Sequence, residues 1–171
     1  QAPDDICVGP TFSVGCAQHH LAFPGTITLR PSTMMAAMQD WTDSLVRHGF
    51  RKIYWFNGHG GNVATIEAAF SEIHAARSFS LNGADMPDLE LKRVNWWDFK
   101  AVEKLCFELY PTGHGMHATA SEVSVTYFGY PDRIPEQPEM SPKIAPMGGI
   151  SDALQYRRDF PDGRIGSDPT Q

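Results

Sequence analysis

Short β-forming segments alternate along this chain with longer segments of helical periodicity. The segments with the length and residue types of strands are residues 6–10, 51–56 and 89–96. The segments with apolar residues at helical intervals are 32–48, 63–77, 97–109, 119–127 and 151–160. This alternation is typical of a parallel sheet with helices on both faces. We therefore predict an α/β fold: a three-layer α/β/α arrangement with a mostly parallel sheet.

Several details of these elements can be tested separately. Ser32 is a good N-cap for the first helix, and Gly49 stands where a left-handed residue ends a helix. Residues 51–56 are short, β-branched and aromatic over their second half, and bounded by glycine on both sides, which predicts a buried strand. The dense prolines of residues 131–146 predict an extended segment without regular structure.

Size and charge exclude several classes of protein. The 171 residues suit a single domain, 1–171, which we expect to be incomplete at both ends. The net charge of −6, without a basic run, argues against nucleic acid or an anionic membrane as partner. No apolar stretch approaches the roughly 20 residues that span a bilayer. Three cysteines without CxxC spacing suit a reducing compartment, so we predict a cytoplasmic location.

Residues 57–62 read NGHGGN between a predicted strand and a predicted helix. Ligands of open α/β sheets gather at the carboxyl ends of strands, so His59 is placed to bind a metal or to act as an acid or base. The alternative is a tight turn with a solvated His59, in which Asn62 only caps the helix. A phosphate cradle is disfavoured because neither Gly-Lys-Ser/Thr nor GxGxxG is present.

A second group of polar residues precedes the predicted helix 119–127. His114 and His117 lie in its leading loop, and Glu122 lies in its first turn, where the helix dipole favours a carboxylate. Thr119 and Glu122 also form a capping-box pattern. Glu122 is therefore structural, functional or both.

A third group is less specific. His20 follows His19 in a loop that either forms part of a site or only exposes both rings. Trp96 and Trp97 end a predicted strand, where core packing is the commoner role of tryptophan. His20, His59, His117 and Glu122 all fall at or near predicted strand ends. They supply the histidine and carboxylate ligands that a catalytic metal takes.

Four segments resemble the creatininase (creatinine amidohydrolase) family, in family order and over nearly the whole chain. They are HLAFPGTITL at 20–29, IYWFNGHGGN at 53–62, HATASEVS at 117–124 and FPDGRIGSDP at 160–169. The resemblance implies a metal-dependent amidohydrolase that cleaves a C–N bond of a small amide, cyclic amide or formamide with metal-activated water. It also implies two divalent metal ions (Zn, Mn or Fe) and a homohexamer.

The resemblance also assigns roles to residues. It implies that His117 is the catalytic acid/base and that His59 ligates metal. Creatininase proper has a metal-ligating Glu and an aromatic residue at the positions of Gly61 and Gly60, so Glu122 is expected to provide the missing carboxylate. The predicted substrate-binding residues are His20, Gly60, Gly61 and Trp97. The family's Glu-x-His-Gly metal motif does not occur in this sequence.

Two functions of other classes remain open at this stage. One is a metal-free small-molecule-binding module. The other is a structural homologue within a larger assembly, whose site is completed by another polypeptide. Metal content would separate the first from the enzyme, and a partner chain that carries the Glu-x-His-Gly motif would favour the second.

Overall fold

A computed structural model describes residues 6–81, 86–136 and 139–171. The regular elements are α1 (Pro31–Arg47), β1 (Lys52–Asn57), α2 (Val63–Phe79), β2 (Glu90–Asn95), α3 (Lys100–Leu109), α4 (Ala120–Gly129) and α5 (Ala153–Asp159). Short 3₁₀ turns lie at Gln18–His20, Gly60–Asn62, Trp96–Asp98 and Pro131–Arg133. Among these described helices, none combines the length and the apolar character that crossing a bilayer would require.

The two strands pair in parallel, from Lys52 opposite Glu90 to Asn57 opposite Asn95. α2 connects them, as the crossover between two parallel strands requires. The predicted α/β class with a parallel sheet is therefore confirmed. Because both strands end in asparagine, two polar side chains meet at the carboxyl end of the sheet.

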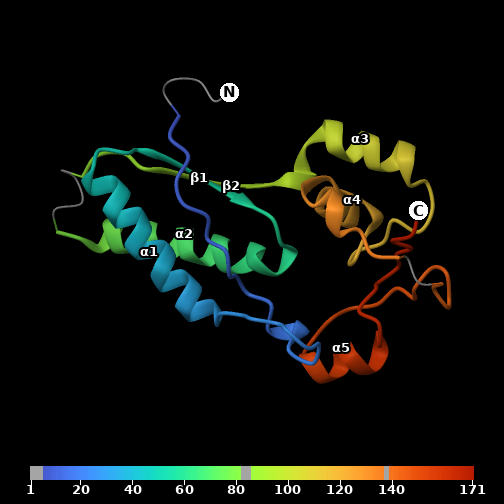
Figure 1. Cartoon of the computed structure of the whole chain (residues 1–171). Coiled ribbons are helices and arrows are strands. Elements are labelled where there is room, and N and C mark those ends of the chain that lie inside the picture. The colour runs from blue at the N-terminus through green and yellow to red at the C-terminus, as the bar shows by residue number, and fades with distance from the viewer. Residues whose placement is uncertain (1–5, 82–85, 137–138) are drawn as a thin grey trace.

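The main core lies between the sheet and helices α1 and α2, which occupy the same side of the two strands (Figure 1). It contains Cys16, Met34, Met38, Ile66, Ala69 and Phe70, with Trp55 and Leu91 packed against them from the sheet. On the other face Tyr54 is exposed and Phe56 is 69% exposed. Since only alternate residues of β1 point into the core, the prediction that this strand is buried throughout is wrong.

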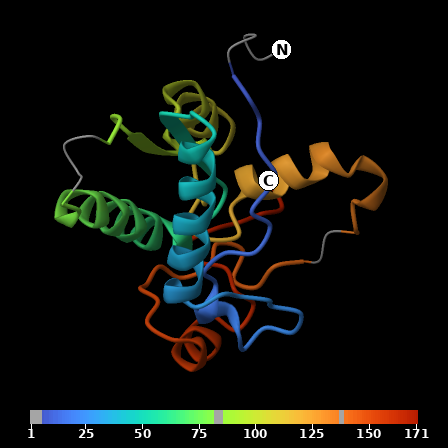
Figure 2. The same ribbon diagram turned by 90° about the vertical axis from the view of Figure 1, so that its left-hand side faces the viewer.

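A smaller core forms around α5. Tyr156, Phe160 and Ile165 are buried there, with Phe23 packed against them. α5 lies beside residues 18–20 in both views of the chain, although the two segments are far apart in sequence (Figures 1 and 2). Figure 2 also shows α2 and α4 on opposite sides of α1. This packing brings the His19–His20 pair toward the C-terminal part of the chain.

Some element boundaries differ from prediction. Residues 6–10 form no strand, and α1 begins at Pro31 with Arg30 as N-cap, so Ser32 is not the cap. Proline at the first helical position needs no N–H partner and has the right φ, which explains the earlier start. Gly49 has φ +96°, as predicted for the residue after the helix.

The capping box of α4 is confirmed in both directions. The Thr119 hydroxyl accepts from the backbone N–H of Glu122, and the Glu122 carboxylate accepts from the backbone N–H of Thr119. Such a cap is worth about 1 kcal/mol. It also fixes the Glu122 side chain at the start of the helix.

Candidate metal and active site

Asparagines hold the turn that carries His59. Asn57 Nδ2 donates to the backbone oxygen of His59 and to Asn95 Oδ1, each at 2.8 Å. Asn57 Oδ1 accepts from the backbone N–H of His59 (3.2 Å) and from Asn62 Nδ2 (3.1 Å). Asn62 Oδ1 accepts from the backbone N–H of Cys16 at 2.8 Å. Asn62 therefore ties two loops together, and the alternative in which its side chain caps α2 is wrong.

This arrangement brings three imidazoles together. His19, His20 and His59 each offer one ring nitrogen, and these nitrogens lie within 4.8 Å of one another. The rings of His19 and His59 are stacked with centroids 5.8 Å apart. His20 Nε2 and His59 Nε2 are buried without a hydrogen-bond partner among the described residues. A buried nitrogen without a partner is costly, and a bound cation is one way to satisfy such an atom.

The protonation of His19 and His20 also suits a metal. Burial, followed by the charges of neighbouring imidazoles, lowers the pKa of His19 and lowers that of His20 to about 4. Both rings are therefore neutral at pH 7 and keep a lone pair for coordination. The donor set fits a transition-metal ion such as those that imidazole ligands select. The alternatives in which His59 is a solvated turn residue and His19 and His20 are merely exposed do not match these positions.

His117 lies beside the trio, with its ring centroid 4.6 Å from that of His20. Burial lowers the pKa of His117, while the Glu122 carboxylate opposes this shift. The backbone of His117 is held from the C-terminal segment: Ser167 Oγ donates to its carbonyl oxygen at 2.6 Å, and Ile165 pairs with it as an antiparallel bridge. The next residue, Ala118, has φ +52°. The ring is thus placed by backbone contacts that do not involve the imidazole.

Tyr156 forms a wall of the same site, which the sequence did not indicate. It is fully buried, with ring centroids 5.2 Å from His20 and 5.8 Å from His117. Its hydroxyl donates to the backbone oxygen of Gly163 at 2.5 Å, and burial raises its pKa. The phenol therefore stays neutral and closes the site from the side of α5.

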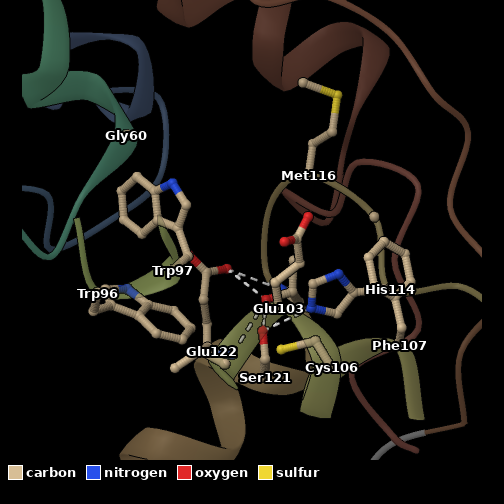
Figure 3. A pocket seen from close by; sticks show the side chains of 13 residues that line it. Gly60, Trp96, Trp97, Glu103, Cys106, Phe107, His114, Met116, Ser121 and Glu122 are labelled. Carbon is tan, nitrogen blue, oxygen red and sulfur yellow. Dashed lines mark hydrogen bonds between the residues drawn. The ribbon is translucent and has the colours of Figure 1, made fainter. Parts of the chain in front are cut away.

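Glu122 belongs to a neighbouring cavity of about 280 Å³. Gly60, Trp97 and His114 also line this cavity, and Figure 3 shows the carboxylate between the tryptophans and the histidine. The structure does not group Glu122 with the three imidazoles: its Oε2 accepts from the backbone N–H and the hydroxyl of Thr119. The predicted residues thus divide between a histidine cluster and a cavity next to it.

Gly61 stands where this chain has no room for a side chain. A Cβ there would lie 2.5 Å from the Cys16 carbonyl oxygen, 2.6 Å from His59 Nε2 and 2.9 Å from His19 Cε1. At Gly60 a Cβ would meet nothing within 4 Å. The two glycines of the turn therefore differ: Gly61 contacts the imidazoles, and Gly60 faces the cavity.

The lowered histidine pKa values predict an acid-sensitive fold. For His19, His20 and His117 the folded pKa lies below the ordinary value of 6.5, so the unfolded chain takes up protons first as the pH falls. Stability is therefore greatest above about pH 6.5 and falls toward about pH 4. We expect the Tm of chelator-treated protein to drop between about pH 7 and pH 5, by about 2–4 °C for each kcal/mol lost. His20→Gln should flatten this dependence, and an unchanged Tm across that range would contradict the prediction.

Together, the fold and the site define an α/β protein with a histidine cluster suited to a metal ion beside the carboxyl end of its parallel sheet. The chain belongs to the creatininase family, described as creatinine amidohydrolase, whose sequence pattern matches residues 1–171. The predicted family is therefore confirmed.

Individual relatives agree with this assignment. The creatinine amidohydrolase of Pseudomonas putida is 32% identical over an alignment of 120 residues, which covers 66% of this chain and 43% of that protein. A mutant creatininase complexed with creatine superimposes with a TM-score of 0.64 at 24% identity, covering 91% of this chain and 64% of the other. A structure described as "Creatininase Mn" superimposes with a TM-score of 0.57 at 24% identity, covering 86% of this chain and 58% of the other. The chain thus spans 43% of the curated relative's length, and the structures share its three-layer α/β/α fold class.

Proposed function

We propose that this chain belongs to a metal-dependent amidohydrolase that cleaves a C–N bond of a small amide, cyclic amide or formamide. One observation carries the proposal: three imidazoles converge, with the Nε2 atoms of His20 and His59 buried and unpartnered, next to His117. The family adds support, since the Pseudomonas putida relative is a creatinine amidohydrolase. The manganese in the description of one related structure supports a divalent ion.

His19, His20 and His59 are the proposed metal ligands. His20, predicted to contact substrate, is thereby reassigned because one of its ring nitrogens lies within 4.8 Å of those of His19 and His59, and its Nε2 has no hydrogen-bond partner among the described residues. A divalent cation held there supplies Lewis acidity that makes a water molecule nucleophilic near neutral pH. The second ion, and the choice among zinc, manganese and iron, remain predictions from the family resemblance.

The chain's own residues have three further tasks in this proposal. His117 would take a proton from the attacking water on its neutral imidazole and give it to the leaving nitrogen, a role for which its lowered pKa and its position beside His20 qualify it. Tyr156 excludes water from the side of α5. Gly60 and Trp97 line the cavity that receives the substrate. A cytoplasmic location and a homohexamer stay predictions.

The proposal is tested by metal content and by hydrolysis. We expect the purified protein to bind Zn, Mn or Fe, and chelation to abolish hydrolysis of a panel of cyclic amides and formamides until metal is returned. His59→Ala should remove most of the bound metal, whereas His74→Ala, on an exposed face of α2, should retain it. A metal-free protein that still binds small amides would favour the binding-module alternative.

Glu122→Gln tests whether the carboxylate also ligates metal. We expect it to lower the bound metal less than His59→Ala does, because the carboxylate lies outside the histidine trio and is held by Thr119. Thr119→Ala is the matched control, since it removes the cap, worth about 1 kcal/mol, and keeps the carboxylate. Equal metal content in Glu122→Gln and the unchanged protein would mean that Glu122 serves only the helix and the cavity.

A further inference from the structure

Four side chains that line the cavity are joined in series by hydrogen bonds. His114 Nε2 lies 2.7 Å from Ser121 Oγ, and Ser121 Oγ lies 3.0 Å from Thr119 Oγ1. Thr119 Oγ1 in turn lies 3.2 Å from Glu122 Oε2. Figure 3 shows the two ends of this chain, His114 and Glu122, on either side of Ser121. Neither the capping box nor the metal cluster requires Ser121 or His114.

The protons in this series of hydrogen bonds can be assigned by counting donors and lone pairs. A hydroxyl has one proton to donate and two lone pairs. Thr119 donates its proton to the Glu122 carboxylate and accepts from the backbone N–H of Glu122, which leaves one lone pair. Ser121 must therefore donate to Thr119, and the remaining bond at Ser121 Oγ must come from His114. This makes His114 Nε2 an N–H donor.

The His114 ring is held from a second side. The Tyr110 ring stacks on it with centroids 6.0 Å apart and planes 7° from parallel. Tyr110 is itself bonded through its hydroxyl to Ser124 Oγ at 2.6 Å. No hydrogen bond of the described part of the chain engages His114 Nδ1. In the neutral ring this nitrogen carries the lone pair and can only accept.

We propose that His114 is a specificity-determining residue that accepts a hydrogen bond from an N–H of the bound molecule. Ser121 and Thr119 position His114 through the series of hydrogen bonds. Trp96, Trp97 and Phe107 give the cavity apolar, aromatic walls. The ligand class is therefore a small planar amide or ureide with a free N–H. The identification of this ligand with the substrate rests on the proposed function.

Two probes test the inference: 2-imidazolidinone and its 1,3-dimethyl derivative, in which a methyl group replaces the hydrogen of each ring nitrogen. Binding is followed on the full chain, after chelation, by quenching of tryptophan fluorescence, since Trp96 and Trp97 line the cavity. One hydrogen bond contributes about 0.5–1.5 kcal/mol, so we expect the N–H probe to bind roughly 2–10-fold more tightly. His114→Phe, which keeps an aromatic ring for Tyr110, should remove this preference.

Two further measurements separate positioning from general packing. Ser121→Ala should reduce the preference for the N–H probe, and Thr119→Ser, which retains both hydroxyls and the cap, should preserve it. The ¹⁵N shifts of His114 should show the Nε2–H tautomer in the unchanged protein. Equal binding of the two probes, no binding of either, a preference that survives His114→Phe, or an Nδ1–H ring would overturn the inference. Because these readouts need neither metal nor turnover, an inactive protein with an intact preference would refute the proposed hydrolysis alone.

Discussion

We expect the replacement of His117 by alanine to lower kcat by about 10²–10⁴-fold, the usual contribution of general acid–base catalysis, and to leave the bound metal in place. Its ring lies beside the three imidazoles but is not one of them. Its backbone is held by Ser167 and Ile165 through bonds that alanine keeps. The truncated chain should therefore fold and load metal, but lack a proton donor for the leaving nitrogen.

Steady-state hydrolysis and metal analysis on the same preparations check this prediction. His74→Ala, which removes an exposed imidazole far from the trio in sequence, should behave like the unchanged protein in both assays. Undiminished kcat in His117→Ala would refute the role of His117. Loss of metal in that variant would instead make the fourth imidazole a ligand.

The sequence predicted those parts of the site that depend on local structure. NGHGGN was correctly placed between a strand and a helix, because the glycines and the flanking apolar runs mark such a turn in the local sequence. The capping box of Thr119 and Glu122 was recognised for the same reason. The convergence of His59 and His117 was also anticipated, since both were assigned to loops near strand ends.

The sequence did not reveal the residues that join the site from a distance. His19 was left as an exposed loop residue because its partner, His59, is forty positions away and is brought near by the bond from Cys16 to Asn62. No sequence pattern indicated that Tyr156 lies beside His20, since an isolated tyrosine in a short helix is equally compatible with an exposed position. The adjacent histidine pair at 19–20 was the one hint available.

Boundary errors have equally physical causes. Residues 6–10 have strand composition but find no strand to pair with among the described residues, and a strand without a partner leaves its backbone groups unpaired. β1 was placed correctly, yet its burial was overestimated, because an apolar run does not show which face a neighbour covers. Long-range packing decided both outcomes.

We expect Gly61→Ala to weaken metal binding and Gly60→Ala to leave metal affinity unchanged. The added methyl at position 61 would meet the backbone oxygen of Cys16 and two histidine rings at 2.5–2.9 Å, so the backbone and the ligands must separate. Overpacking of this kind costs about 1–3 kcal/mol. We expect at least about a tenfold loss of metal affinity, equivalent to 1.4 kcal/mol.

Gly60→Ala is a close control, because it adds the same methyl one residue earlier in the same turn, where nothing lies within 4 Å. Neither glycine has a positive φ, so both substitutions are free of backbone strain and differ only in what the methyl touches. Metal titration monitored by Tm compares the two variants directly. If both retain metal equally, the rings of His19 and His59 can rearrange around a side chain, and the close approach at Gly61 does not shape the ligand set. If only Gly61→Ala fails, the absence of a side chain at this position is what allows the second imidazole to face His59.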